Sequence, residues 1–262
     1  MIAQKDPKAT MRDMTLGQRS DNVGVATLGL RPTGAFSPCV ACLVKDRNLC
    51  HMLLAGKETG RAFAQVHATA ARREVLVDAE RESDNISVIC DGWAFRFRRI
   101  RDGRRHILYF LIPGDVVYAL PGAPGFAVQA LTDLRYCKFA YSEVKVGLRD
   151  DPALFDAWEA NLVAERMRLA STSVALGQFN ASERIAQLVL QLRDRLEARK
   201  LLHDESCPFP LRQSHIADAT GLTTVHISRT LSAFRRDQIF AIEDGTLKIF
   251  DPAKLRRIGE GG

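Results

Sequence analysis

The sequence predicts an α+β protein in which an antiparallel β domain precedes a long helix and a helix-turn-helix with a small β hairpin. Three observations carry this prediction. Residues 51–148 contain short alternating apolar patterns separated by Gly, Pro and Asp turn signals. Residues 151–176 lack Gly and have Pro only at their start. Residues 211–236 read as two amphipathic helices joined at a Gly.

The composition is that of a soluble globular chain. Of the 262 residues, 46% are hydrophobic and 26% are charged, and no stretch approaches the roughly 20 apolar residues of a membrane-spanning helix. Residues 1–22 lack the apolar core of a secretory signal, so we expect a cytoplasmic protein without a membrane partner. The formal net charge of +6 only hints at nucleic-acid binding.

Changes in pattern along the chain divide it into four parts. The first has no periodicity, so we expect it to be flexible. The parts are a flexible arm (residues 1–35), the β domain (36–150), the long helix (151–177) and the helix-turn-helix domain (178–262).

A hairpin is the clearest signal in the β domain. Apolar and polar side chains alternate over residues 93–98, Asp102-Gly103 supplies a turn, and the alternation resumes at Ile107. We expect the basic side chains within residues 96–105 to cover a solvated sheet face. Pro113-Gly114-Asp115 then separates the hairpin from further strands.

The long helix is expected to begin at Asp151 as N-cap, followed by proline. Four apolar residues in it, seven positions apart, predict a seam that a single helix cannot bury, so a second copy of the chain is the expected partner. The simpler alternative is packing on the chain's own β domain. Glu165, on the neighbouring line, would weaken a dimer seam and make association conditional. The seam residues are Phe155, Leu162, Leu169 and Leu176.

The helix-turn-helix carries the most specific pattern in the chain. Asn180 with Glu183 predicts a capping box where its domain begins. Further on, Gly221 permits a sharp turn, Thr223 is the expected N-cap of the second helix, and Ile227 lies on the inner face of that helix. A hairpin around residues 243–245 would form a wing. The alternative is a helical hairpin without a DNA function.

The outer face of the second helix presents short polar side chains and one arginine, which is able to pair with guanine. We expect His226 to contact a phosphate or to be solvated. The predicted DNA-binding residues are Thr224, Val225, His226, Ser228, Arg229 and Ser232.

Three of the six cysteines, Cys39, Cys42 and Cys50, lie within twelve residues. In a reducing cytosol, clustered thiols are more often metal ligands or redox groups than disulfides. Cys137 stands far from them in the sequence. We expect Cys90, at the end of a strand pattern, and Cys207, in a loop just before a proline, to be non-ligands. His51 and His203 are expected to be solvated.

Over about residues 39–260 the chain resembles the CRP/FNR superfamily of bacterial transcription regulators. The matching segments are PGD at 113–115, FAVQAL with the following cysteine at 126–137, NASERIAQL at 180–188 and GLTTVHISRTL at 221–231. The resemblance implies a β-roll (double-stranded β-helix) sensor domain, a homodimer, binding to a two-fold symmetric promoter site in double-stranded DNA, and contact with RNA polymerase. It implies a regulator, and no catalytic motif indicates an enzyme.

The cysteine spacing resembles the oxygen-sensing FNR branch, in its rhizobial form. By that resemblance Cys39, Cys42, Cys50 and Cys137 bind an oxygen-labile [4Fe–4S] cluster, for which four thiolates are the usual ligands. The segment 116–131 lacks the acidic residue and the Arg-Ser pair of cyclic-nucleotide-binding members. We therefore expect no cyclic nucleotide, because its phosphate would have no cationic partner.

Two points depart from this assignment or compete with it. Val225 stands where typical FNR proteins have Glu, so the usual FNR target site is not expected. The thiols have two alternatives to the cluster, a structural zinc site and a reversible redox role. The alternative function is a regulator of the same family without a cluster, which responds to haem, nitric oxide, thiol oxidation or only its own abundance.

Overall fold

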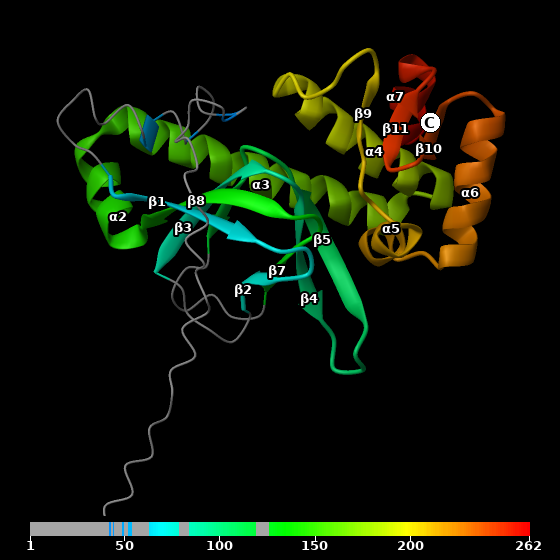
Figure 1. Ribbon diagram of the computed structural model, residues 1–262. Helices are drawn as coiled ribbons and strands as arrows, with labels where there is room; N and C mark the ends of the chain where they lie inside the picture. Colours follow the sequence, from blue (N-terminus) through cyan, green and yellow to red (C-terminus); the bar gives the residue numbers. More distant parts are fainter. Residues whose placement is uncertain are drawn as a thin grey trace, which may run out of the picture. The chain divides into compact units, whose positions relative to one another are not determined.

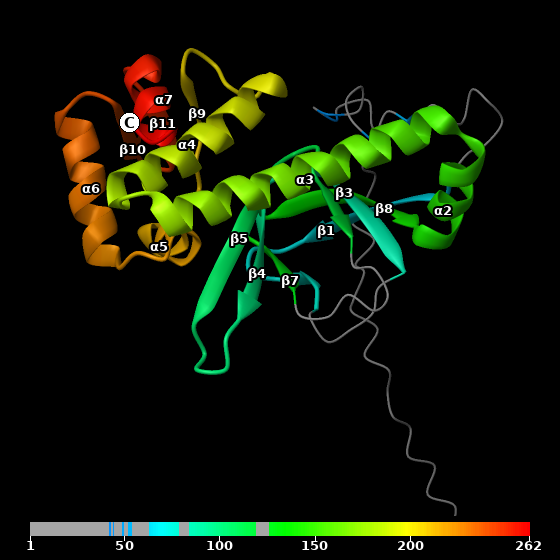
Figure 2. The ribbon, with the colours of Figure 1, turned by 180° about the vertical axis from the view of Figure 1, so that it is seen from behind.

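The structure is a computed structural model that describes residues 42, 44, 49, 52–53, 63–78, 84–118 and 126–262 (Figures 1 and 2). The expected arm, together with Cys39, Cys50 and His51, lies outside the described residues. None of the described helices is long and apolar enough to cross a membrane.

Two antiparallel four-stranded sheets form the β domain in the described part of the chain, as the sequence predicts. Their orders are β1-β8-β3-β6 and β2-β7-β4-β5. Buried apolar side chains such as Ile89, Tyr109 and Val128 pack in a shared core. The strands are β1 (Gln65–Ala70), β2 (Val75–Val77), β3 (Asn85–Asp91), β4 (Ala94–Arg99), β5 (Arg105–Leu111), β6 (Val116–Tyr118), β7 (Ala127–Ala130) and β8 (Leu134–Ala140).

The predicted hairpin is confirmed as β4 and β5, with Gly103 at a φ of 87° in the turn. The expected solvated basic face is wrong for two of its arginines. Arg96 is largely buried and donates to the carbonyl of Tyr118 at 2.9 Å. Arg105 lies over the ring of Phe95 and pairs with Asp218 at 2.6 Å. Both arginines also have an acidic partner from a helix, since Glu165 lies 3.4 Å from Arg96 and Asp218 pairs with Arg105.

A helix ends the segment 51–148, for which the sequence pattern predicts only short strands. α2 (Tyr141–Asp150) follows β8 directly. Val144 and Gly147 are buried three positions apart, which is the spacing of one helix face.

The long helix and its successor begin at the predicted caps. α3 (Pro152–Gln178) starts at Asp151, whose carboxylate accepts from the backbone N–H of Leu154 at 3.1 Å. α4 (Ala181–Ala198) starts with the capping box of Asn180 and Glu183. Each cap satisfies N–H groups that a helix start leaves without partners.

The winged helix-turn-helix is also confirmed. Gly221 has a φ of 68° in the turn, and the Thr223 side chain caps the second helix. The sequence did not predict β9, which pairs with β11, nor the last helix, which packs on α4. The elements are β9 (Ser206–Pro208), α5 (Gln213–Thr220), α6 (Thr224–Arg236), β10 (Phe240–Glu243), β11 (Thr246–Ile249) and α7 (Pro252–Gly259).

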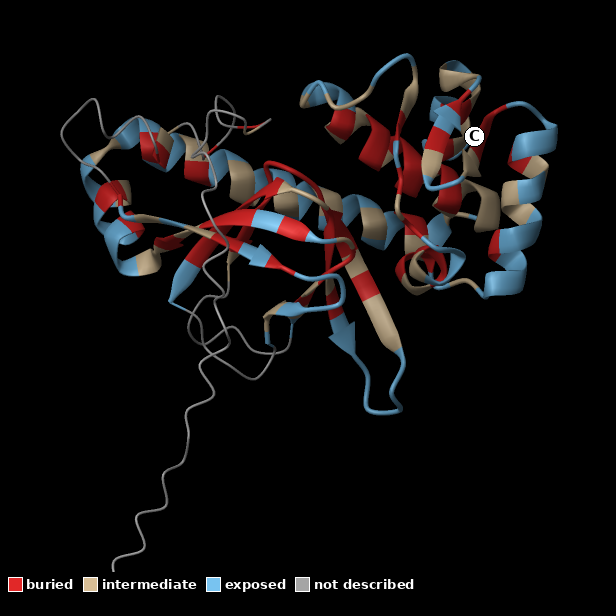
Figure 3. Cartoon of the chain, viewed as in Figure 1, coloured by how far each residue is buried: buried red, intermediate tan, exposed pale blue. Residues whose placement is uncertain are grey.

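One apolar core joins the outer side of the β domain to the helix-turn-helix domain. It includes Trp93 and Phe110 from the β domain and Phe209 and Ile216 from the helix-turn-helix domain. Figure 3 marks buried residues along β5, α4 and α5. Burial of this apolar area favours a fixed arrangement of β5 against α4 and α5.

Asp115 ties α4 to the turn after β5. Its buried carboxylate accepts hydrogen bonds from Arg195 and, at 2.7 Å, from Arg199. It also accepts from the backbone N–H of Ile112 at 2.8 Å. Burial alone would raise the pKa of Asp115, but the two guanidinium charges outweigh it and hold the pKa well below its usual range.

Replacing Asp115 by Asn should lower the free energy of unfolding by about 3–5 kcal/mol, because two arginines lose the carboxylate that neutralises them. Since the folded-state pKa is depressed, the contribution of Asp115 is present above its ordinary pKa and is lost as the pH falls through the lower folded value. Urea unfolding of wild type and variant at several pH values measures this. A difference that is already lost at pH 6 would contradict it.

Candidate functional site

All six predicted DNA-binding residues lie on the exposed side of α6. Ile227 and Phe234 on the opposite side are buried, so packing fixes which side faces outward. Val225 is 65% exposed, so its apolar side chain is accessible from outside. The arrangement presents an apolar group beside polar ones, as base readout requires, although contact with DNA stays a prediction.

Two of these side chains are held by the helix itself. The ring Nδ1 of His226 lies 3.1 Å from the Thr223 hydroxyl, and Ser232 donates to the carbonyl of Ser228 at 2.9 Å. Arg229 makes no hydrogen bond or ion pair with the described residues. Its guanidinium is therefore available to an external acceptor.

The prediction omitted the cations at the end of α6. Arg235 and Arg236 are exposed, and Arg235 reaches Glu243 of the wing at 3.0 Å. Lys248 of the wing lies 3.9 Å from the same carboxylate. Basic residues in a last helical turn are readable in the sequence, so this signal was present. Such side chains can contact backbone phosphates, and they fix position rather than sequence.

Cys90 and Cys137 form the centre of a thiol site in the β domain. Their sulfur atoms lie 3.2 Å apart, and Cys137 Sγ lies 3.4 Å from the Nδ1 atom of His67. Hydrogen bonds with Cys137 and Cys42, together with burial, raise the pKa of Cys90 above its ordinary value. The structure therefore brings Cys42 and Cys137 to one place, and it adds Cys90, which was expected to be a non-ligand.

The donor chemistry of this site fits a soft metal group. Deprotonation of the buried thiols is costly, because burial disfavours the charged form, and a cation would reverse that cost. Among the described residues, no group of three or more His, Cys, Asp or Glu side chains is arranged to hold a metal ion. The two other predicted ligands, Cys39 and Cys50, lie outside the described residues.

The remaining expected non-ligands lie apart from the thiol site. Cys207 is buried in β9, and burial raises its pKa to about 11. His203 is exposed, as expected.

One face of α3 binds the chain's own β domain. Trp158 is buried there, and Glu165, whose side chain is only 12% exposed, accepts hydrogen bonds from Tyr109 and Tyr118 and pairs with Arg96 at 3.4 Å. The interpretation of Glu165 as an unfavourable residue in a dimer seam is therefore wrong. Its carboxylate is satisfied within the chain.

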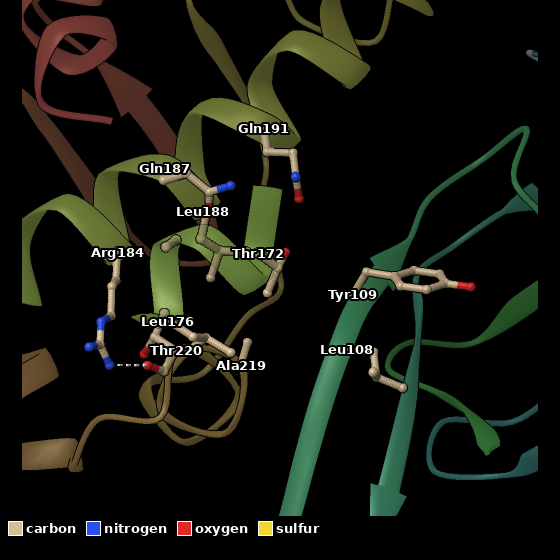
Figure 4. A pocket seen from close by; sticks show the side chains of 11 residues that line it. Leu108, Tyr109, Thr172, Leu176, Arg184, Gln187, Leu188, Gln191, Ala219 and Thr220 are labelled. Atoms are coloured by element: carbon tan, nitrogen blue, oxygen red, sulfur yellow. Dashed lines mark hydrogen bonds between the residues drawn. The ribbon is translucent and has the colours of Figure 1, made fainter. Parts of the chain in front are cut away.

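The four predicted seam residues are divided between two environments. Phe155 and Leu169 are exposed, whereas Leu162 packs on the β-domain core. Leu176 lines a small pocket of about 20 Å³ with Leu188 and other residues of α4 and α5, where Figure 4 shows it among Thr220 and Ala219. Half of the predicted line thus packs within the chain.

A different line of α3 is fully exposed and apolar. It lies opposite Trp158 and Glu165, with alternating spacings of four and three residues, which is the pattern of a two-helix seam. In the views of Figures 1 and 2, α3 runs beside the β strands and its outer side stays uncovered. The exposed stripe consists of Val163, Met167, Ala170 and Val174.

The space between α3 and β6 is almost filled. The cavity there has a volume of about 10 Å³, which is at the lower limit for holding one water molecule. Its lining includes Asp115, Tyr118, Trp158, Glu165 and Arg168. Two of the lining residues bind each other, since the Tyr118 hydroxyl donates to the Glu165 carboxylate. The negative charge of Glu165 would repel an anionic ligand in this space.

Known proteins share both the sequence and the fold of this chain. Residues 183–258 match the family described as Crp-like helix-turn-helix domain. The chain is 28% identical to the nitrogen fixation regulation protein FixK of Bradyrhizobium diazoefficiens, over 87% of this chain and 96% of that protein. It is 25% identical to the transcriptional activator protein FnrL of Cereibacter sphaeroides, over 78% and 84%. The solved structure of FixK2 from Bradyrhizobium japonicum superposes with a TM-score of 0.67 at 22% identity, over 74% of this chain and 97% of that chain.

Proposed function

Because this chain belongs to the CRP/FNR superfamily of transcription regulators, we propose that it is a homodimeric promoter-binding activator whose DNA affinity follows an oxygen-labile [4Fe–4S] cluster. The cluster assignment rests on one observation. Cys42 and Cys137 are far apart in the sequence, but both interact with Cys90. The activating sense follows the name of FnrL. Contact with RNA polymerase is what the family resemblance implies.

DNA reading is assigned to α6. Arg229 is available for a guanine, and Val225 suits the methyl group of a thymine better than an amino donor. Arg235 and Arg236 are placed to contact phosphates beside these bases. Two copies of α6 in a dimer would reach two half-sites about one helical turn apart, so a monomer would bind more weakly.

Cys39, Cys42, Cys50 and Cys137 would hold the cluster, which supplies an oxygen-sensitive iron–sulfur group when bound. The chain links this site to α3 through one core. Cys137, Leu154 and Trp158 belong to the same buried cluster of side chains. A change of packing around Cys137 therefore acts on the helix that carries the exposed stripe, and on dimerisation through it.

No cyclic nucleotide is proposed as a ligand. The small space between α3 and β6 and the Glu165 carboxylate support this, because a cyclic phosphate would have little room there and would meet a negative charge. The second candidate function is a regulator of the same family that responds to thiol oxidation without a cluster. The 3.2 Å contact between Cys90 and Cys137 favours it over haem, nitric oxide or abundance as the signal.

Protein prepared without oxygen should contain about four iron and four sulfide per protomer and absorb visible light, and the absorption should collapse in air. Cys42→Ser and Cys137→Ser should lose both, because each removes a ligand. Cys207→Ser is the control, since Cys207 is buried elsewhere. An iron-free wild-type dimer that binds its DNA equally with and without oxygen would contradict the cluster.

Arg229→Ala should weaken binding to the specific site by about 1–3 kcal/mol, and Val225→Glu should change the preferred base at one position. Arg236→Ala is the matched control, because loss of a phosphate contact weakens all sequences alike. Binding titrations on a set of half-site variants at fixed salt measure this. Identical base preferences for wild type and Val225→Glu would refute the placement of α6.

Met167→Glu should raise the dimer dissociation constant roughly 5- to 150-fold, since a charge enters the exposed stripe at a cost of about 1–3 kcal/mol. Phe155 is exposed as well but lies off the stripe, so Phe155→Glu should change the dimer dissociation constant much less. Sedimentation equilibrium of both variants distinguishes the two lines. A larger effect of Phe155→Glu than of Met167→Glu would contradict the exposed stripe as the dimer contact. It would support the seam predicted from the sequence, which consists of Phe155, Leu162, Leu169 and Leu176.

A further inference from the structure

Cys90 lies beside Cys137 because of an irregularity in β3. Val88 pairs directly with Cys137 across the two strands, and the register shifts between Ile89 and Asp91. Cys90 is thus the extra residue of a β-bulge, two positions beyond Val88 and on the same sheet face. Diagonal neighbours on one face are within reach of each other's side chains, and the bulge leaves the two sulfur atoms 3.2 Å apart.

This distance is close to that of a bond between the sulfur atoms. A disulfide has an S–S length of about 2.05 Å, so closure requires a movement of about 1.2 Å, within the range of side-chain rotation. Strands β3 and β8 are already hydrogen-bonded neighbours at the centre of their sheet. Cys207, by comparison, is equally buried, in a different part of the fold.

We propose that Cys90 and Cys137 form a dithiol that a peroxide oxidises to an intrachain disulfide. One sulfur attacks the peroxide O–O bond and becomes a sulfenic acid, and one water leaves. The second sulfur displaces the hydroxyl group as another water. In total the two thiols lose two electrons and two protons, and hydrogen peroxide becomes two water molecules.

The pair has a regulatory consequence that rests on the proposed cluster. Cys137 is one of the four assigned ligands, and a sulfur engaged in a disulfide has no thiolate to offer a metal. Once the cluster is lost, oxidation of the pair would block its reassembly until a thiol reductant opens the bond. Cys90 would then determine whether recovery follows removal of oxygen alone or also requires reduction.

The first test uses the full-length apoprotein with hydrogen peroxide as oxidant. After blocking free thiols and digesting with trypsin without reductant, mass spectrometry should find residues 82–96 joined to residues 136–138 and lighter by two hydrogen atoms. Cys90→Ala and Cys90→Ser should lack this product, and Cys207→Ala should retain it. A wild-type protein in which Cys90 stays free, or in which Cys137 joins another cysteine, overturns the proposal.

The second test separates this inference from the proposed function. Peroxide-treated protein is freed of oxidant and supplied with iron and sulfide without oxygen, with and without dithiothreitol, and iron content and visible absorption are measured. Wild type should take up iron only with dithiothreitol, and Cys90→Ala without it. Equal uptake by oxidised wild type in both conditions overturns the regulatory consequence. No uptake by reduced wild type overturns the cluster, while the peptide map still decides the disulfide.

Discussion

The carboxylate of Glu165 fixes the rotation of α3 about its own axis. It is held by two tyrosine hydroxyls and an arginine from three different strands, so the helix cannot turn without leaving a buried charge unpaired. The opposite face must then point away from the β domain. The exposed apolar stripe, the position of Trp158 in the thiol-site core and the filled space beneath α3 all depend on this one orientation.

A second buried charge, that of Asp115, fixes the orientation of the helix-turn-helix domain against the β domain. Asp115 belongs to the β domain, Arg195 belongs to α4, and Arg199 is the C-cap residue of α4. Neither side of this ion-pair group is satisfied without the other. Arg105 and Asp218 add a partly exposed contact between β5 and α5. Apolar burial supplies most of the attraction between these elements, and the ion pairs select one arrangement among those that the apolar surfaces would permit.

Local signals made much of the fold predictable. The caps at Asp151, Asn180 and Thr223, and the turn glycines at 103 and 221, act within a few residues, and each is where the sequence places it. The outer face of α6 was predictable for the same reason, since its inner face carries large apolar residues.

What the sequence did not reveal depends on partners far along the chain. Two lines of α3 carry apolar residues, and a helix of 3.6 residues per turn drifts by about 20° per heptad, so spacing alone did not decide between them. The hydrogen bonds of Glu165 with two tyrosines more than forty residues away determine which line faces outward. The sequence did not predict that Cys90 lies beside Cys137, because a β-bulge brings the two together and no sequence motif indicates this bulge.

In the proposed complex, the affinity of α6 for DNA has two contributions that respond differently to ions. The exposed side chain of Val225 supplies one of them. Water around this apolar group is released when it is covered, and that gain changes little with salt. Contacts of Arg235 and Arg236 with phosphates would weaken as salt rises, because the release of counterions from DNA into a more concentrated salt solution gains less free energy. In the proposed complex, raising the ionic strength would therefore lower the affinity for every sequence while discrimination at the base that faces Val225 persists.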